Sequence, residues 1–463
     1  MRSISVVLST ILTATYALPS ADKISPDTIN IGFDDPEYGK HALTMEKLMQ
    51  EKLRFWQEME DIGGFNDTYE ASGSKACSGG KAGEYKCSNI DLMSFLPHSS
   101  LGGKSAKGND VWGWTSPDGR EFGVVCQWDG TAFVEVKKDG SMVYLGRLNS
   151  QAGASQWRDA KVIADHAYIG AESSGSGMQI FDLKQLLDIK PDAPKIWAKE
   201  DVVLFKEFGN SHNIVANPAT HTIFAAGTGK DLKCKGGLWM VDVKDPKNPK
   251  DAGCVAEDGY THDADCVIYN GPHKQYQGRE ICFNYNEKQL AIFDVTERSK
   301  PKMLSRMTYK DAVYCHQGWI IDPEMKYLAF DDEADENFGW GPAKGGKTIT
   351  YIVDIQDLTA PKITGYFQSS QKASDHNLYS IGGIVYQSNY GAGLRVIDMR
   401  SVVEDPTGKK FQEIGYFDVR PEDDAEGGKP GYVAAWSVYP FFKSGHILIN
   451  SIERGIFSVK MRS

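Results

Sequence analysis

Long apolar runs, clusters of basic residues and the short motifs of common enzymes are all missing from this chain. No stretch approaches the ~20 consecutive apolar residues of a membrane-spanning helix, so the sequence predicts no membrane span. The 463 residues carry 62 acidic and 51 basic side chains, a net charge of −11, and the basic ones form no cluster. This balance argues against nucleic acid or an anionic membrane as a partner.

Recognisable catalytic motifs are also absent. There is no Gly-x-Ser-x-Gly elbow, no His-Glu-x-x-His pair, no phosphate-binding loop and no dinucleotide fingerprint. A serine nucleophile assembled from distant loops stays open, but no feature of the sequence points to one. Motifs alone therefore leave it undecided whether the protein is an enzyme.

The N-terminus has the pattern of a secretory signal peptide. Arg2 precedes a mostly apolar segment over residues 6–12, and small residues follow it, so we predict a signal peptide over residues 1–17. Eight cysteines fit an oxidising compartment, and Asn66-Asp67-Thr68 is a glycosylation sequon. We expect a secreted, extracellular protein that is glycosylated at Asn66.

An internal repeat runs through most of the chain: two apolar residues, an acid and one more apolar residue. Its copies are Phe133-Val134-Glu135-Val136, Ile180-Phe181-Asp182-Leu183, Met240-Val241-Asp242-Val243, Ile292-Phe293-Asp294-Val295, Ile352-Val353-Asp354-Ile355, Val396-Ile397-Asp398-Met399 and, degenerately, Ile456-Phe457-Ser458-Val459. Each copy reads as a strand, and neighbouring apolar runs raise the number to four strands per repeat. Acid positions 44–60 residues apart are typical of β-propeller blades. The sequence thus predicts an all-β, seven-bladed β-propeller.

The two ends of the repeat region predict how the ring closes. The chain stops after the third strand of repeat seven, while residues 90–96 resemble the fourth strands of other repeats. We expect this segment to be an N-terminal latch strand that completes blade seven, which leaves no long edge open. Residues 18–86 then form an N-terminal extension and residues 87–463 the propeller. Apolar residues at helical spacing over 39–60 predict an amphipathic helix, which packs on a propeller face or carries a partner.

The cysteines pair readily within this scheme. Three disulfides are predicted because their members fall on adjacent strands or close a small loop: Cys77–Cys87, Cys234–Cys254 and Cys266–Cys282. Cys126 and Cys315 belong to distant blades, so we expect both to remain free thiols.

Four histidines occupy the same place in successive repeats, at the start of the strand that lines the central channel. They are His212, His262, His316 and His376. Four imidazoles that meet near one axis could hold Fe, Cu or Zn. They could equally form a polar collar that bonds the next blade, or a ligand site without metal.

Charged residues beside these histidines have candidate roles. Asp159, Asp263 and Asp375 could orient the rings, and Asp159, Arg158 and Asp263 could position a small substrate or water. The run that begins Asp331-Asp332-Glu333 could bind Ca²⁺, although a solvated loop is the preferred interpretation. Several tryptophans fall in or beside the first strands, and one or two of them could line a pocket. They are Trp112, Trp114, Trp157, Trp319 and Trp436.

The repeat and several segments near the channel carry a family resemblance. The strands resemble the LVIVD repeat, and the channel segments resemble the choice-of-anchor B family of secreted propeller proteins. These segments are Gly108–Trp114, Gln156–Asp159, Gly259–Asp263, Gln277–Glu280, His316–Trp319 and Ala435–Pro440. The resemblance runs from about Cys87 to the C-terminus. It implies an exported β-propeller and no particular reaction.

Two functions from different classes follow. The first is a secreted propeller whose histidine site binds a transition metal and acts on a small substrate, as an oxidoreductase or a hydrolase. The second is an extracellular scaffold without activity that binds a protein or glycan, with the histidines as a structural collar. Metal content separates the two.

Overall fold

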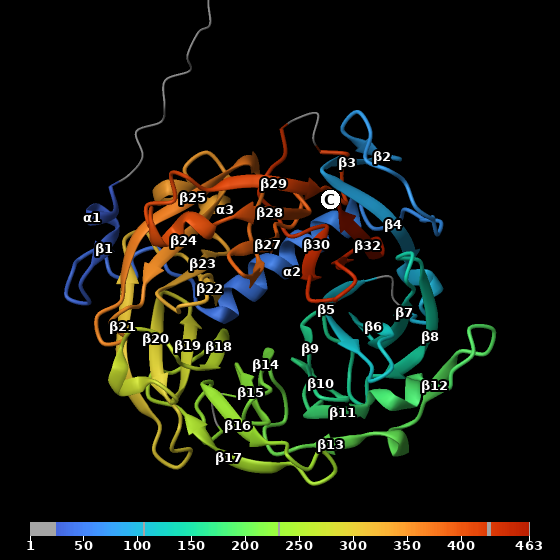
Figure 1. Cartoon of the computed structure of the whole chain (residues 1–463), viewed down its shortest axis with the longest axis horizontal. Helices are drawn as coiled ribbons and strands as arrows, with labels where there is room; N and C mark the ends of the chain where they lie inside the picture. The colour runs from blue at the N-terminus through green and yellow to red at the C-terminus, as the bar shows by residue number, and fades with distance from the viewer. Residues whose placement is uncertain (1–24, 105–106, 230–231, 424–426, 463) are drawn as a thin grey trace, which may run out of the picture.

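Seven four-stranded antiparallel sheets form a ring in the computed structural model, which confirms the seven-bladed β-propeller (Figure 1). The structure describes residues 25–104, 107–229, 232–423 and 427–462. The predicted signal peptide over residues 1–17 lies outside them. No helix within these ranges is long and apolar enough to cross a membrane.

Each blade runs from an inner first strand to an outer fourth strand. Blade one consists of β5 (Gly108–Thr115), β6 (Glu121–Gln127), β7 (Gly130–Val136) and β8 (Met142–Asn149). Blade two consists of β9 (Arg158–Ile163), β10 (His166–Ala171), β11 (Met178–Asp182) and β13 (Val203–Phe205). Blade three consists of β14 (Asn213–Asn217), β15 (Thr222–Ala226), β16 (Leu238–Asp242) and β17 (Lys250–Val255). Blade four consists of β18 (Asp263–Ile268), β19 (Glu280–Asn286), β20 (Gln289–Asp294) and β21 (Lys302–Tyr309). Blade five consists of β22 (Cys315–Ile320), β23 (Tyr327–Asp332), β24 (Lys347–Asp354) and β25 (Lys362–Lys372). Blade six consists of β26 (Asn377–Ile381), β27 (Ile384–Ser388), β28 (Leu394–Asp398) and β29 (Gln412–Phe417). Blade seven consists of β30 (Ala435–Tyr439), β31 (His446–Ser451), β32 (Gly455–Met461) and β4 (Ile90–Pro97).

Short elements decorate this ring. Three outer blade edges gain strands: β1 (Asn30–Ile31) on β21, β12 (Lys195–Trp197) on β8, and β3 (Tyr85–Ser88) with β2 (Lys81–Ala82) on β29. The α-helices are α1 (Pro26–Ile29), α2 (Met45–Asp61) and α3 (Asp335–Phe338). The 3-10 turns are η1 (His98–Ser100), η2 (Leu183–Leu186), η3 (Lys199–Asp201), η4 (Lys274–Tyr276), η5 (Gly341–Ala343) and η6 (Arg400–Val403).

The repeated acid ends the third strand of its blade by a local hydrogen bond. The carboxylate of Asp242, for example, accepts the backbone N–H of Lys244 at 2.9 Å. The same bond to the residue two positions on is made by Asp182, Asp294, Asp354 and Asp398. A carboxylate bonded in this way favours a turn over continued strand. Glu135, which is one methylene longer, instead pairs with Arg120 at 2.9 Å.

The predicted latch is confirmed. β4 pairs antiparallel with β32, from Met461 opposite Ile90 to Gly455 opposite Pro97, and supplies the fourth strand of blade seven. A segment near the start of the chain thus closes the ring against the last strand.

The cysteine predictions are confirmed as well. The three predicted disulfides are present, and Cys126 and Cys315 are buried free thiols. Glycosylation of Asn66 stays a prediction; this side chain is exposed, as an acceptor must be.

The predicted amphipathic helix is α2, and it packs on the propeller. Thr44 caps its N-terminus by accepting the N–H of Lys47. Its buried side chains fall at helical spacing: Met45, Leu48, Lys52, Trp56 and Met59. They meet aromatic residues at the starts of first strands, and in Figure 1 α2 crosses the central opening. The helix therefore covers one end of the channel.

Candidate functional site

The four repeat histidines converge. Their ring centroids lie 4.4 Å apart between His212 and His262, 4.2 Å between His262 and His316, and 4.5 Å between His316 and His376. Each residue stands at the start of the first strand of blades three to six, and no ring is more than 4 % exposed. The register of the repeat thus places four imidazoles in one buried arc.

The Nδ1 atoms of three of these rings face carbonyl oxygens of the next blade. Nδ1 of His262 donates to the carbonyl of His316 at 2.9 Å, and Nδ1 of His316 to that of His376 at 3.0 Å. Nδ1 of His376 donates to the carbonyl of Trp436 at 2.6 Å. A carbonyl only accepts, so we assign the proton of each neutral ring to Nδ1 and a free lone pair to Nε2.

These bonds are also the collar between blades that the sequence suggested. The groups that orient the rings differ from the expected Asp159, Asp263 and Asp375. They are the three carbonyls, Glu172 on Nδ1 of His212 at 2.9 Å, and Asp331 near Nδ1 of His316 at 3.2 Å. Sequence position alone did not show which neighbour each Nδ1 would reach.

The acidic run that begins at Asp331 is buried, so its interpretation as a solvated loop is wrong. Asp331, Asp332 and Glu333 are each at most 1 % exposed. Nor do the three side chains come together as the Ca²⁺ site that was the alternative. Asp332 accepts bonds from the backbone of residues 313 and 314 and from a tyrosine hydroxyl, while Asp331 and Glu333 turn toward the histidines. Tertiary contacts beneath α2 account for the burial.

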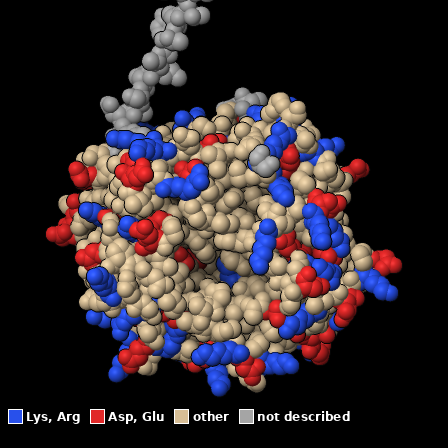
Figure 2. All heavy atoms as spheres, in the orientation of Figure 1, with Lys and Arg blue, Asp and Glu red and all other residues tan. Residues whose placement is uncertain are grey.

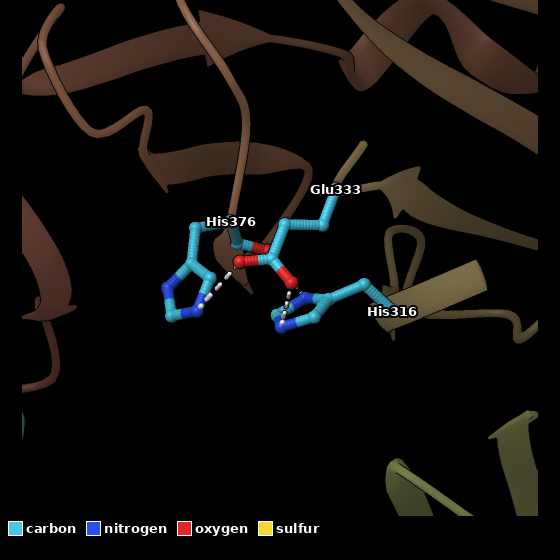
Figure 3. Close-up of side chains that lie close together, drawn as sticks. All are labelled: His316, Glu333 and His376. Carbon is cyan, nitrogen blue, oxygen red and sulfur yellow. Dashed lines mark hydrogen bonds and ion pairs between the residues drawn. The ribbon is translucent and has the colours of Figure 1, made fainter. Parts of the chain in front are cut away.

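Glu333 lies between His316 and His376, the last two histidines of the arc (Figure 3). Its Oε2 is 3.7 Å from Nε2 of His316, and its Oε1 is 3.5 Å from Nε2 of His376. Atoms of these three residues lie within 4.8 Å of one another, a spacing that suits a metal ion. Glu37, His41 and Asp311 meet the same criterion, but they are half-buried and remote from the repeat histidines in the sequence.

Lys52 of α2 brings a cation to the same carboxylate. Its Nζ lies 2.5 Å from Oε1 of Glu333, and the two side chains are at most 1 % exposed. The hydroxyl of Tyr390 donates to Oε1 at 2.6 Å. The ammonium also lies 5.5 Å from the ring centroid of Tyr432 and 5.6 Å from that of Trp436.

Burial and neighbouring charges set the protonation states here. Burial lowers the pKa of His262, His316 and His376 well below the usual value, so the rings are neutral. Burial acts to raise the pKa of Glu333, but the ammonium of Lys52, His376 and the hydrogen bonds from Lys52 and Tyr390 together outweigh it, and the pKa falls below its usual value. Burial lowers the pKa of Lys52 against the attraction of Glu333.

Two buried atoms in this cluster lack a hydrogen-bond partner among the described residues. They are Nε2 of His262 and Oε2 of Glu333. With the proton of His316 on Nδ1, its Nε2 and Oε2 of Glu333 face each other as two lone-pair groups. Buried acceptors without a donor cost free energy, and a cation between them would remove that cost.

The other predicted site residues lie apart from the arc. Arg158 is buried and donates to the carbonyl of Gln127 at 3.0 Å. Asp159 pairs with Nζ of Lys161 at 2.9 Å. Asp263 lines a cavity farther along the first strands. In the part of the chain that the structure describes, no hydrogen bond or ion pair joins these three to the four histidines.

That cavity has a volume of about 590 Å³ and is lined by residues of the first strands of all seven blades. Trp112 and Trp319 belong to its wall, which confirms that one or two tryptophans line a pocket. Figure 2 shows a hollow at the centre of the visible face, with charged residues of both signs scattered around it. Sequence reasoning missed Lys161 in this cavity, and Lys52 and Glu333 at the histidines.

Comparisons with known proteins add little beyond the fold. No family model and no curated protein matches this chain. A solved structure of hydrazine synthase from Kuenenia stuttgartiensis is similar with 12% identity and a TM-score of 0.51, over 78% of this chain and 98% of that one. The β-propeller domain of Cps50 (Swd1) from Myceliophteria thermophila has 12% identity, the same coverage and a TM-score of 0.44. The first similarity concerns the fold alone, and the second is too weak to carry an argument.

Proposed function

We propose that this protein is a secreted propeller of the choice-of-anchor B type that binds a transition metal in its histidine arc. His316, His376 and Glu333 are the proposed ligands, with His262 adjacent and His212 completing the arc. The three disulfides agree with an extracellular location.

One observation carries the metal proposal. The Nδ1 atoms of three neighbouring histidines are occupied by carbonyls, so their Nε2 lone pairs remain, and two of them flank one carboxylate. Imidazole held through its other nitrogen, together with a carboxylate, is a donor set that suits Fe, Cu and Zn. The unpartnered Nε2 of His262 and Oε2 of Glu333 fit the same interpretation.

The residues would divide the work as follows. The carbonyls fix the orientation of the rings, and Tyr390 fixes the carboxylate through its hydroxyl. Lys52 pairs with Glu333 and offsets its charge under α2. A metal held there would supply Lewis acidity for hydrolysis, or redox chemistry if it were iron or copper. Positioning of a small substrate by Asp159, Arg158 and Asp263 stays a prediction.

Elemental analysis of protein secreted by its own host, without an affinity tag, tests the proposal. We expect near-stoichiometric Fe, Cu or Zn, and its identity decides between hydrolytic and oxidative chemistry. The double variant His316→Asn, His376→Asn should lose the metal but stay folded, because the amide nitrogen of Asn takes about the place of Nδ1. His446→Asn, in the second strand of blade seven and equally buried, is the matched control. Protein that carries no metal and takes up no Co²⁺ on titration would exclude the proposal.

The scaffold function has support of its own. The Nδ1 bonds tie blade four to five, five to six and six to seven, and Lys52 already provides a cation for Glu333. A scaffold that binds protein or glycan needs no more than this collar. In that case His316→Ala, His376→Ala should lose stability while the Asn pair does not, and neither should change the metal content.

A further inference from the structure

The 590 Å³ cavity extends along the inner strands, from Asp263 at the first residue of β18 to Ile268 and Tyr439 at the last residues of β18 and β30. Its lining includes Val215, Ile268, Trp319, Tyr379 and Tyr439, all beyond the first residue of an inner strand. Inner strands run in one direction around the ring, so this cavity opens toward the channel end away from α2. Its volume is in the range of sites for small molecules.

We propose that this cavity binds a small organic cation, namely a protonated amine carried on an aromatic body. The assignment is separate from the metal site and does not depend on it. It rests on the wall of the cavity, on the charges at its floor and on its size.

The wall offers aromatic surface. Trp112 and Trp319 each pack against Tyr379, with ring centroids 5.5 and 5.3 Å apart, and Phe441 lies 5.8 and 6.2 Å from the two tryptophans. Tyr439 adds a fifth ring, 5.2 Å from Trp112. Rings at these distances prefer edge and tilted contacts, and they accept a further aromatic ring or a cation over a face.

The floor of the cavity carries more acidic than basic side chains. Lys161 contributes the one ammonium group of the described lining, and it already pairs with Asp159 at 2.9 Å and Asp110 at 3.3 Å. Asp263 and Asp265 also line the cavity; Asp263 feels the charge of Lys161 without forming an ion pair, and no cation of the described residues acts on Asp265. Asp265 is 5 % exposed.

The hydrogen bonds of these two carboxyls leave room for a ligand. Asp265 accepts one backbone bond, from Ile320 at 3.4 Å, and Asp263 one from Ala264 at 2.7 Å. Each thus has an oxygen without a hydrogen-bond donor in the described part of the chain. Nζ of Lys161 already lies 4.7 Å from the ring centroid of Trp112. Buried carboxyls gain from a charged donor, so a second ammonium group, placed at Asp265, would complement the cavity. Anionic ligands would meet repulsion instead.

Calorimetric titration of the full chain with three probes of one shape tests this proposal. Phenethylamine is the cation, 2-phenylethanol the neutral analogue and phenylacetate the anion. We expect the amine to bind about tenfold or more tightly than the alcohol, because a charge pair in a partly desolvated site is worth roughly 1–2 kcal/mol, and the anion not to bind. Butylamine, which lacks the ring, should bind more weakly than phenethylamine.

The variant Asp265→Asn tests whether Asp265 is the group that distinguishes the charged amine from the neutral alcohol. We expect this variant to lose about tenfold in affinity for phenethylamine and to keep its affinity for 2-phenylethanol. Asp242→Asn, at the end of a third strand outside the cavity, is the matched control and should change neither. If Asp265→Asn does not fold, Asp263→Asn with the same readout takes its place. Equal affinity for amine and alcohol, equal losses for both in the variant, or no binding of any probe would overturn the proposal.

Discussion

The two ends of the channel are built from the same seven inner strands but differ in whether their buried charges have partners. At the strand starts, α2 covers neutral imidazoles and a carboxylate that is matched by Lys52. Farther along these strands lies an aromatic cavity whose Asp265 has no matching cation among the described residues. The repeat supplies polar groups at both ends, and a segment outside the repeat completes only one of them. The covered end is the one for which we propose a metal-binding role, and the incomplete end is the one for which we propose a ligand from solution.

Removing the cation from the covered end should have the largest effect. We expect Lys52→Met to lower the free energy of unfolding by about 3–5 kcal/mol, because Glu333 is left as an unpaired buried charge. Chemical denaturation measures this, and Lys47→Met, which is exposed on the same helix, should change stability by less than about 0.5 kcal/mol. Added Co²⁺ should restore part of the loss if the arc binds metal. Equal stability of the two variants would show that the pair does not hold α2 in place.

A smaller loss should follow from removing one hydrogen bond to the same carboxylate. Tyr390→Phe deletes the hydroxyl that donates to Glu333, and bonds to charged groups contribute roughly 1.5–3 kcal/mol. Tyr285→Phe provides a control from blade four, because that buried hydroxyl has no partner in the described residues. We expect the control to be neutral within about 0.5 kcal/mol in the same denaturation experiment. Similar losses in both variants would mean that Glu333 does not depend on this bond.

An effect of opposite sign, which depends on pH, is expected at the open end. Burial raises the pKa of Asp265 to about 7, so the folded state binds its proton more tightly than the unfolded state does. This carboxyl therefore destabilises the protein progressively as pH rises from about 4 through 7, where it must ionise. Asp265→Asn should then be more stable than the parent at pH 8 by up to about 4 kcal/mol, and nearly equal to it at pH 4. A variant less stable at pH 8 would show that Asp265 already has a partner.

Such a gain would explain why the open end is poorly satisfied. A buried carboxyl that binds a ligand cation but has no partner in the empty protein lowers the stability of that protein, whereas its amide analogue does not. The same substitution should then raise stability and abolish the preference for an amine over an alcohol. The two effects together would distinguish a ligand site from a chance arrangement of acids.

The sequence predicted what the repeat controls. The acid column marks the strand ends because a carboxylate can bond the backbone two residues on, as Asp242 does. The shared register of four histidines placed them around one axis, and an orphan strand at residues 90–96 predicted the latch. In each case the information lies in local bonding or in the period, and both are visible in one chain.

What the sequence could not show depends on contacts between distant segments. Lys52 and Glu333 are 281 positions apart, 333 less 52, and neither belongs to the repeated pattern. The run at Asp331 looked solvated because charges alone do not reveal that a helix covers them. Asp263 follows His262 directly, yet the two side chains form hydrogen bonds with different neighbours. Only the three-dimensional arrangement shows which neighbour each one contacts.

The latch also determines the order of events when the chain folds. β4 is made early, but its partner β32 is the last strand to be synthesised, 371 positions away at Met461 opposite Ile90. Blades one to six can therefore form while the ring is still open, and during that time the edge of β4 and the buried face of α2 remain uncovered. Closure of so long a loop is slow, and an exposed strand edge invites pairing with other chains. Deleting β32 should consequently yield protein that aggregates rather than a propeller with six blades.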